Sequence, residues 1–487
     1  MRISIEYQYS DRNYTRFVTY AGTTQEHEKW SIGGYLYSEN DMKNQPLQQN
    51  LSVNQVQTLV NAGDNPDLMS TSSAYLDTYS ENKILYKKNI INGISVFVYS
   101  NVPTDELYNV KFSLIGTNLG NYILSSAAAV GKIYSYVAPI NGIPQGNYEP
   151  IVRLIAPTEL QIATVLGKFN PSEKTSLDFE IGVSNNDNNL FSSIDDNDNR
   201  GIAGKINLRQ QLFSKKWKID YFANYQLIQK QFKTIERLFT IEFDRDWNLN
   251  NPIGTQSYLV SGLHFNLPEK GNITYQFENL GFKDSFSGTR QVLNGNLTLK
   301  KWNIQNKGSF LKSESKYSSS VFIRNQTQIK YHYNKNWAGA TLRLEDNQEK
   351  LKATNLFSSL SQKFTEFGGF IGRGDSTKVF IELGYLNRTN DSIQSGLIKR
   401  VNNSQSYYLK SKLIKTDTRD LSLFVNYRNL KFTDLTRTAE PSLNSRVLYN
   451  DRFFNQLIQL ATVYETNSGA IAQQEFAYLE VEPGRGI

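Results

Sequence analysis

Long runs in which apolar and polar residues alternate constrain the fold of this chain more than any other feature. In a β-strand every second side chain points to the same face, so strict alternation predicts strands with one apolar and one polar face. The apolar members of the first clear run are Leu177, Phe179, Ile181 and Val183. Further runs lie at residues 217–227, 273–277, 329–333, 379–385 and 421–427. From about Thr175 onward, the pattern therefore predicts a ladder of antiparallel strands.

Strand length and side-chain character favour one architecture for this ladder. Soluble strands average about 5 to 6 residues, whereas crossing a bilayer takes about 9 to 11, and several runs reach the longer figure. The polar faces carry Lys, Asp, Glu, Gln and Asn, which suit a water-filled interior better than a packed core. We therefore predict an all-β chain that forms an antiparallel transmembrane β-barrel of the outer-membrane type. About 14 to 16 runs are recognisable, which leaves closure of the barrel open.

Overall hydropathy agrees with strands and disagrees with membrane-spanning helices. The longest apolar run, at residues 126–130, is far shorter than the roughly 20 residues that such a helix needs. The mean hydropathy is −0.49. A barrel strand exposes only alternate side chains to lipid, so a low mean hydropathy is compatible with it.

Changes in the residue pattern divide the chain into four parts. Residues 1–50 hold two alternating runs, with Ile3 and Ile5 in the first and Trp30, Ile32 and Leu36 in the second, and are assigned to the barrel. Residues 51–157 form a small insert module, 158–475 supply the barrel strands, and 476–487 begin a further, truncated module.

Local signals inside the insert module predict one helix and several short strands. Ser52 followed by Gln55 is a capping-box pattern, and Gly63 stands where a helix would end. Asn92-Gly93 between two apolar runs predicts a tight hairpin. Further strand-like runs lie at residues 108–115, 133–137 and 152–155.

Both ends of the sequence suggest a fragment of a longer protein. The chain begins inside a strand-like run with no signal peptide, and it stops in a turn-rich passage. An exported barrel needs a signal peptide, which we expect upstream of Met1.

Composition narrows the partners. The chain has no cysteine, which excludes disulfides, thiolate metal sites and thiol nucleophiles. The net charge of +7 is scattered along the chain, whereas a nucleic-acid surface clusters its Lys and Arg. We therefore expect the lipid bilayer of the outer membrane as the main partner, with other envelope proteins as further candidates and no nucleic acid.

No set of residues predicts chemistry. His27, His264 and His332 are far apart, and none has a neighbour at metal-ligand spacing. No nucleophile elbow, phosphate-binding loop or distinctive carboxylate pair is present. We therefore predict no enzyme and assign no catalytic, cofactor-binding or metal-binding residue.

The acidic run from Asp195 to Asn199, followed by Arg200-Gly201, invites comparison with a calcium loop. An EF-hand needs Gly at its sixth position and Glu at its twelfth, where this chain has Arg200 and Ile206. The run therefore reads as an acidic turn between strands, with an irregular Ca²⁺ site as the alternative.

Two further features concern the barrel wall. Opposite charges are dense in residues 234–248, which predicts an ion-pair ladder across neighbouring strands, with a functional lining of the lumen as the alternative. Tryptophans near the ends of strand-like runs fit an interfacial aromatic girdle. They are Trp217, Trp247, Trp302 and Trp337.

Several passages resemble a family of large, uncharacterised outer-membrane proteins of Bacteroidota. The first passage is Glu236-Arg237 with Glu242-Phe243-Asp244-Arg245-Asp246-Trp247-Asn248. The others are Tyr14-Thr15-Arg16-Phe17 with Asn44-Gln45-Pro46-Leu47-Gln48-Gln49, and Tyr136-Val137-Ala138-Pro139 with Gly142 and Pro144-Gln145-Gly146-Asn147-Tyr148-Glu149-Pro150. The resemblance implies an exported multi-stranded barrel with inserted β modules, and it supplies no reaction. An internal echo fits such an array, since Phe112, Ile115 and Gly120 have the same offsets as Tyr478, Val481 and Gly486.

The predicted function is that of a non-enzymatic outer-membrane β-barrel protein: a pore, a transport or secretion component, or a surface scaffold. Neither an N-terminal plug nor an energy-coupling box of a nutrient importer is recognisable. The alternative is a soluble secreted β-protein that acts as an adhesin or glycan-binding module. A barrel must display a continuous apolar belt, whereas a soluble protein must not.

Overall fold

The computed structural model describes residues 2–6, 16–43, 50–128, 131–375 and 377–468. The predicted module at 476–487 and the echo at Tyr478 lie outside the described residues.

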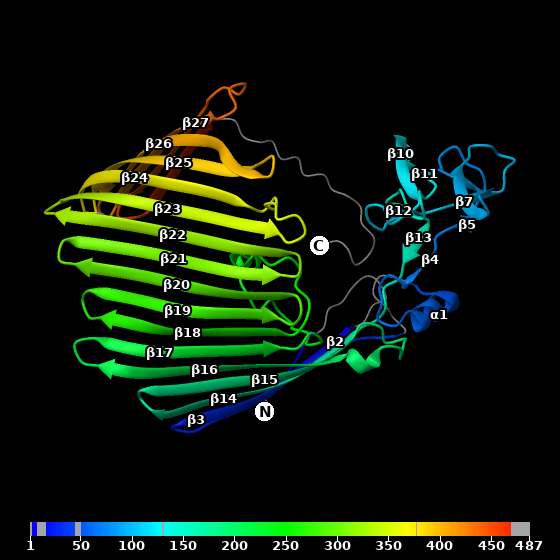
Figure 1. The fold of residues 1–487 in the computed structure, drawn as a ribbon, viewed down its shortest axis with the longest axis horizontal. Coiled ribbons are helices and arrows are strands. Elements are labelled where there is room, and N and C mark those ends of the chain that lie inside the picture. The colour runs from blue at the N-terminus through cyan, green and yellow to red at the C-terminus, as the bar shows by residue number, and fades with distance from the viewer. Residues whose placement is uncertain (1, 7–15, 44–49, 129–130, 376, 469–487) are drawn as a thin grey trace.

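One antiparallel sheet of 19 strands dominates the molecule (Figure 1). From one edge to the other, the paired strands are β1, β2, β3 and then β14 to β29 in sequence order. The strands are β1 (Arg2–Glu6), β2 (Arg16–Glu26), β3 (Trp30–Asp41), β14 (Glu159–Ser172), β15 (Thr175–Asp187), β16 (Arg200–Ser214), β17 (Lys218–Ile228), β18 (Gln256–Leu267), β19 (Gly271–Phe282), β20 (Phe286–Leu299), β21 (Trp302–Ser315), β22 (Ser318–Tyr333), β23 (Asn336–Leu351), β24 (Gln362–Gly374), β25 (Phe380–Gln394), β26 (Leu397–Lys415), β27 (Arg419–Phe432), β28 (Glu440–Phe453) and β29 (Ile458–Ser468).

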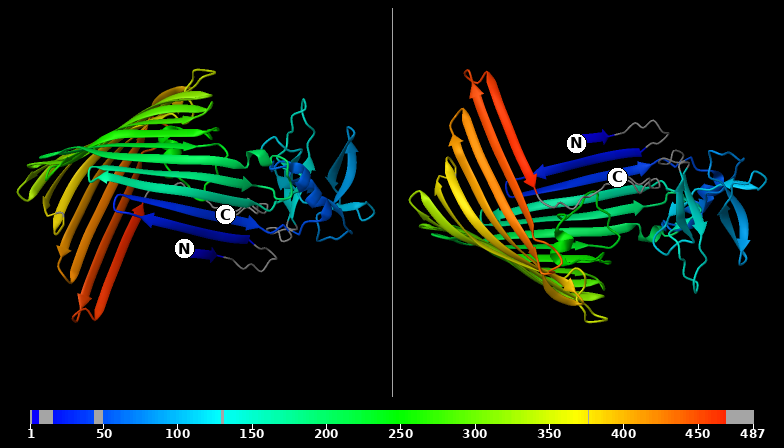
Figure 2. Two further views of the ribbon diagram at one scale, coloured as in Figure 1. Left: turned by 90° about the horizontal axis from the view of Figure 1, so that it is seen from below. Right: turned by 90° about the horizontal axis from the view of Figure 1, so that it is seen from above.

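Strand length and sheet shape confirm the predicted fold class. Apart from β1, the strands of this sheet are 11 to 19 residues long, which is enough to cross a bilayer. The sheet bends round on itself like the wall of a barrel (Figure 2). In the part of the chain that the structure describes, its edge strands β1 and β29 do not pair with each other. The architecture is thus an outer-membrane-type barrel wall, seen as an open sheet.

The two faces of the sheet differ as the alternation predicts. On one face, here called the outer face, large apolar side chains are exposed from strand to strand; Ile181, Ile371 and Tyr407 have exposed fractions of 52%, 62% and 52%. Trp30, Ile32 and Leu36 share this face, as predicted. The opposite, inner face carries polar and charged side chains such as Glu278 and Glu345, which are buried. The alternation therefore separates an apolar outer face from an inner face that is rich in polar and charged residues.

A smaller unit is inserted between two neighbouring strands of this sheet. β3 pairs directly with β14, although residues 42–158 lie between them in the chain. The helix of this unit is α1 (Val53–Ala62). Its strands are β4 (Ser70–Ser72), β5 (Tyr75–Leu76), β6 (Tyr86–Ile91), β7 (Ile94–Tyr99), β8 (Leu107–Asn109), β9 (Ser113–Leu114), β10 (Tyr122–Ala128), β11 (Gly131–Tyr136), β12 (Tyr148–Glu149) and β13 (Ile151–Arg153).

The local predictions for this unit are confirmed at its helix and its hairpin. Ser52 and Gln55 form both hydrogen bonds of a capping box, and Gly63 ends α1 with a φ of 60°. Asn92 and Gly93 form the two-residue turn between β6 and β7, with φ values of 50° and 79°. Positive φ at both positions is what this turn requires. The run predicted at 108–115 is instead divided into β8 and β9, which belong to different sheets.

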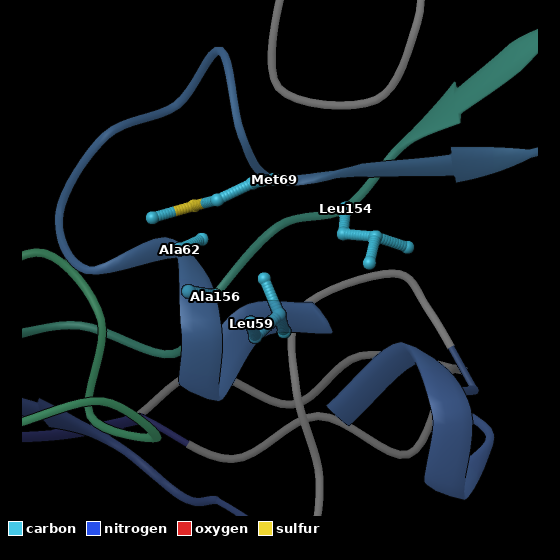
Figure 3. Close-up of a cluster of buried hydrophobic side chains, with 5 residues drawn as sticks. All are labelled: Leu59, Ala62, Met69, Leu154 and Ala156. Atoms are coloured by element: carbon cyan, nitrogen blue, oxygen red, sulfur yellow. The ribbon is translucent and has the colours of Figure 1, made fainter. Parts of the chain in front are cut away.

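Two apolar clusters hold the inserted unit together. The first packs Leu59 and Ala62 of α1 against Met69, just before β4, and against Leu154 and Ala156, just after β13 (Figure 3). The second is aromatic and joins two small sheets through Tyr86, Phe112 and Tyr122. Burial raises the pKa of Tyr86 to about 12, while its hydroxyl accepts a hydrogen bond from the Tyr134 N–H.

The chain between β15 and β16 fastens this unit to the large sheet. Asn189 is fully buried, and its side-chain amide donates to the carbonyl oxygens of Leu59 and Gly63, both at 2.7 Å. The Ser192 hydroxyl donates to the Val60 carbonyl at 2.7 Å. These bonds satisfy carbonyl groups that the C-terminal end of α1 would otherwise leave without partners.

Connections of very different length lie at the two ends of the sheet. At one end neighbouring strands are joined by short turns, such as residues 173–174, 300–301 and 334–335. The other end carries the inserted unit and the long connection at residues 229–255 (Figure 1). The two ends are called the short-turn end and the long-connection end below.

Candidate functional site

The connection between β17 and β18, residues 229–255, folds back onto the inner face of the sheet and is here called the luminal segment. It contains the short helix α2 (Phe243–Trp247). The prediction that residues 234–248 form a charged ladder across neighbouring strands is therefore wrong. These residues follow the end of β17 and do not enter the sheet.

An apolar anchor fixes the luminal segment to the wall. Trp247 has an exposed fraction of 0%. It packs with wall residues of β19 to β22, which are Leu280, Phe286, Leu311 and Phe322. The Arg290 guanidinium lies 4.9 Å from the centre of the indole ring. Burial of a whole indole is a large apolar contribution, so this residue determines where the segment sits.

Ion pairs beside the anchor tie the same helix to several strands. Asp246 pairs with Arg290 of β20 at 3.3 Å and with Arg324 of β22. Arg245 pairs with Glu345 of β23 at 2.8 Å. The opposite charges recognised in the sequence thus meet between the segment and the wall, which supports a structural role for them. Their partners are distant in the chain and could not be read from it.

Asn248 ends α2 and adds neutral hydrogen bonds to the wall. It lies in the left-handed region, with a φ of 52°. Its side-chain amide donates to Asn347 at 2.7 Å and to the Ser320 hydroxyl at 3.0 Å. Four consecutive residues therefore hold the luminal segment on the wall. They are the ion-paired Arg245 and Asp246, the buried Trp247 and the hydrogen-bonded Asn248.

A hollow of about 390 Å³ lies on the inner face beside α2. Its cationic lining residues are Arg290, Lys307, Arg324 and Arg343, and its anionic ones are Asp246, Glu278 and Glu345. Because the two signs are interleaved, their fields largely cancel and favour neither anions nor cations. No histidine is among the lining residues, and each lining carboxylate has an arginine partner.

The three histidines are not brought together. His27 stacks on Trp30 in the turn before β3, with ring centres 4.1 Å apart. His264 forms a hydrogen bond of 2.8 Å with Thr274, and His332 lies on the inner face near Trp337. Within the described residues, no group of three or more His, Asp or Glu is placed to hold a metal ion. That the protein is not an enzyme stays a prediction.

The acidic run at Asp195 forms the last part of the connection between β15 and β16, residues 188–199. It contains the short 3-10 helix η1 (Asp196–Asp198). Burial, together with the negative charges of Asp198 and Asp195, raises the pKa of Asp64, which follows α1. Among the residues that the structure describes, these carboxylates form no group that could hold a metal ion. The acidic run is part of the connection that fastens α1 to the sheet.

The tryptophans are only partly placed as an interfacial girdle requires. Trp217 and Trp302 lie at the short-turn end with exposed fractions of 53% and 47%. Trp30 lies at the same end and was not in the predicted set. The predictions for Trp247 and Trp337 are wrong. Trp247 is the luminal anchor, and Trp337 is buried and donates to Glu382 at 2.8 Å.

Comparison with solved structures finds outer-membrane proteins. The ferric enterobactin receptor PfeA of Pseudomonas aeruginosa shares 9% identity with a TM-score of 0.32, over 95% of this chain and 70% of that one. The FrpB iron transporter of Neisseria meningitidis shares 7% with a TM-score of 0.30, over 94% and 74%. OccAB3 of Acinetobacter baumannii shares 12% with a TM-score of 0.28, over 64% and 93%.

Such distant likenesses do not decide what this chain does. No protein-family model matches the sequence, and no curated protein matches it significantly. No helix in the described part of the chain is long and apolar enough to span a membrane. The conclusions below rest on the two faces of the sheet and on the luminal segment: the chain has the fold of an outer-membrane-type β-barrel wall.

Proposed function

We propose that this chain forms the wall of a bacterial outer-membrane barrel with a non-enzymatic role, as a pore, a transport or secretion component, or a surface scaffold. The observation that carries the proposal is the outer face, on which apolar side chains are exposed on successive strands. Membership of the Bacteroidota family that the sequence resembles is part of the proposal.

Strand register makes the apolar surface of the outer face continuous across β25 to β28. Tyr385 pairs with Tyr407, Tyr407 with Tyr427, and Tyr427 with Leu443, so one line of large apolar side chains crosses four strands. The Tyr385 and Tyr407 rings are 5.2 Å apart. Soluble monomers rarely expose apolar patches larger than a few hundred Å². This favours lipid contact over the soluble adhesin or glycan-binding alternative.

We infer that the polar inner face lines a passage and that the luminal segment narrows this passage. Charged side chains of both signs line it, and the segment lies against β19 to β23. No group on this face singles out a substrate, so we assign none.

The insert module at residues 51–157 is proposed to project from the cell surface. Outer-membrane barrels have short periplasmic turns and longer extracellular connections. The module lies at the long-connection end, together with the base of the luminal segment. This orientation suits a surface scaffold as well as a transporter.

Membrane insertion can be tested with two matched arginine substitutions in the full chain. Leu342 lies on the outer face near the middle of β23 and pairs with Thr327 of β22, and the next residue of β22, Gln328, lies on the inner face. Leu342→Arg should destabilise the vesicle-inserted state by about 2 to 4 kcal/mol, whereas Gln328→Arg should change it little. The measurement is folding into phospholipid vesicles across a urea series, read as heat-modifiable gel mobility. A wild-type chain that stays soluble and monomeric without detergent would contradict the proposal.

A further inference from the structure

An apolar groove of about 410 Å³ is cut into the outer face at the short-turn end. It crosses β22 to β25. Its apolar walls are Tyr331, Tyr333, Ala338, Ile371, Ile381 and Leu383. The groove is a local hollow in a wall that we assign to lipid.

The groove arises from one small residue between large ones. Ala338 pairs with Tyr331 on one side and with Ile371 on the other. Its methyl group cannot fill the width that the tyrosine and isoleucine side chains leave between them. The hollow is therefore set by the register of three strands and is present without any rearrangement.

A cation stands at the mouth of the groove. Arg373 is exposed and lines the groove. It lies two residues beyond Ile371, on the same face and near the end of β24. None of the described carboxylates forms an ion pair with it. A second cation, Lys301, lies with its Nζ 5.0 Å from the centre of the Tyr333 ring.

The surrounding residues place this mouth at the depth of lipid headgroups. Trp302 packs on Tyr331 with ring centres 4.8 Å apart, and both lie beside the short turns. Aromatic residues with polar edges favour the membrane–water interface. An unpaired arginine at that depth faces phosphates, while the groove beside it reaches toward the acyl chains.

We propose that this groove binds one anionic phospholipid, with an acyl chain over Ala338, between Tyr331 and Ile371, and the phosphate on Arg373. The shape takes a hydrocarbon chain, and the unpaired cation provides the charge complementarity that selects an anionic headgroup. The inference rests on the proposed membrane location of the outer face.

Native mass spectrometry of the full chain in detergent tests the groove. Phosphatidylglycerol and phosphatidylcholine with identical acyl chains are titrated separately. We expect the first lipid bound to be held about five-fold more tightly when it is phosphatidylglycerol. Arg373→Gln should remove this preference, and Ala338→Phe, which fills the groove, should weaken both lipids. The matched control is Arg437→Gln, at the long-connection end, where the arginine pairs with Glu440 at 3.3 Å.

Three outcomes would overturn the inference. The two lipids could bind equally to the wild-type chain, Arg373→Gln could behave like Arg437→Gln, or Ala338→Phe could abolish a dimer mass instead of a lipid mass, which would assign the groove to a second copy of the chain. Inorganic phosphate added at the same concentration should not compete, because the acyl chain supplies most of the binding. Failure here with normal vesicle insertion would leave the proposed membrane location intact.

Discussion

At the scale of single residues, Trp247 has the largest expected effect on the luminal segment. Trp247→Ala removes a fully buried indole, and such truncations cost about 3 to 5 kcal/mol. We expect the backbone amides of α2 to exchange hydrogen for deuterium much faster, while those of β19 to β22 change little. Hydrogen-exchange mass spectrometry of the detergent-folded protein measures this.

Two further variants serve as controls, Leu238→Ala elsewhere in the luminal segment and Trp247→Phe at the anchor position itself. Leu238 is 51% exposed, so Leu238→Ala should leave the exchange of α2 nearly unchanged. The Trp247 Nε1 has no hydrogen-bond partner in the described part of the chain, so Trp247→Phe loses no hydrogen bond and should disturb α2 less than alanine does. Equal effects of all three variants would show that the indole is not the anchor.

At the scale of elements, the luminal segment is an addition to a wall that does not depend on it. The wall strands on both sides pair over their full length, and β17 pairs directly with β18. Replacing residues 231–253 with a short glycine-rich turn should therefore leave heat-modifiable folding intact and increase the passage of small solutes. Swelling of vesicles in sugar solutions measures this permeability. Unchanged permeability with normal folding would mean that the segment does not narrow a passage.

At the scale of the whole molecule, the unequal ends of the sheet predict a topology. The chain has no cysteine, so single-cysteine variants can be labelled cleanly. Asn92→Cys lies at the tip of the module's hairpin, and Asn334→Cys lies in a short turn at the other end. On intact cells that express the full-length protein, a membrane-impermeant maleimide should label Asn92→Cys alone, and after lysis it should label both.

The opposite labelling would reverse the proposed orientation. Labelling of both positions on intact cells would contradict a membrane-spanning wall. Both substitutions are at exposed turn positions with positive φ, 50° and 53°, so each should cost about 1 to 2 kcal/mol of local stability and leave the long strands folded.

The sequence alone was enough to predict the long strands of the sheet, their two faces, the capped helix and the tight hairpin, because these features depend on neighbours in the chain. Alternate side chains of a strand point to opposite faces, so Leu177 to Val183 could be assigned to one face without knowing their partners. The capping box at Ser52 and the hairpin at Asn92-Gly93 involve residues at most a few positions apart. These predictions are confirmed.

Only the tertiary structure decided the features that depend on residues far apart in the chain. In the sequence, Trp247 and Trp337 lie near the ends of strand-like runs, as interfacial tryptophans do. In the structure, Trp247 packs on Leu280 and Phe322, and Trp337 donates to Glu382, so both lie on the inner side of the wall. The direct pairing of β3 with β14 needs strands on both sides of the insert. The grooved outer face arises because Ala338 stands between Tyr331 and Ile371. Period-two alternation fixes which way a side chain points, whereas packing against distant strands fixes what it meets.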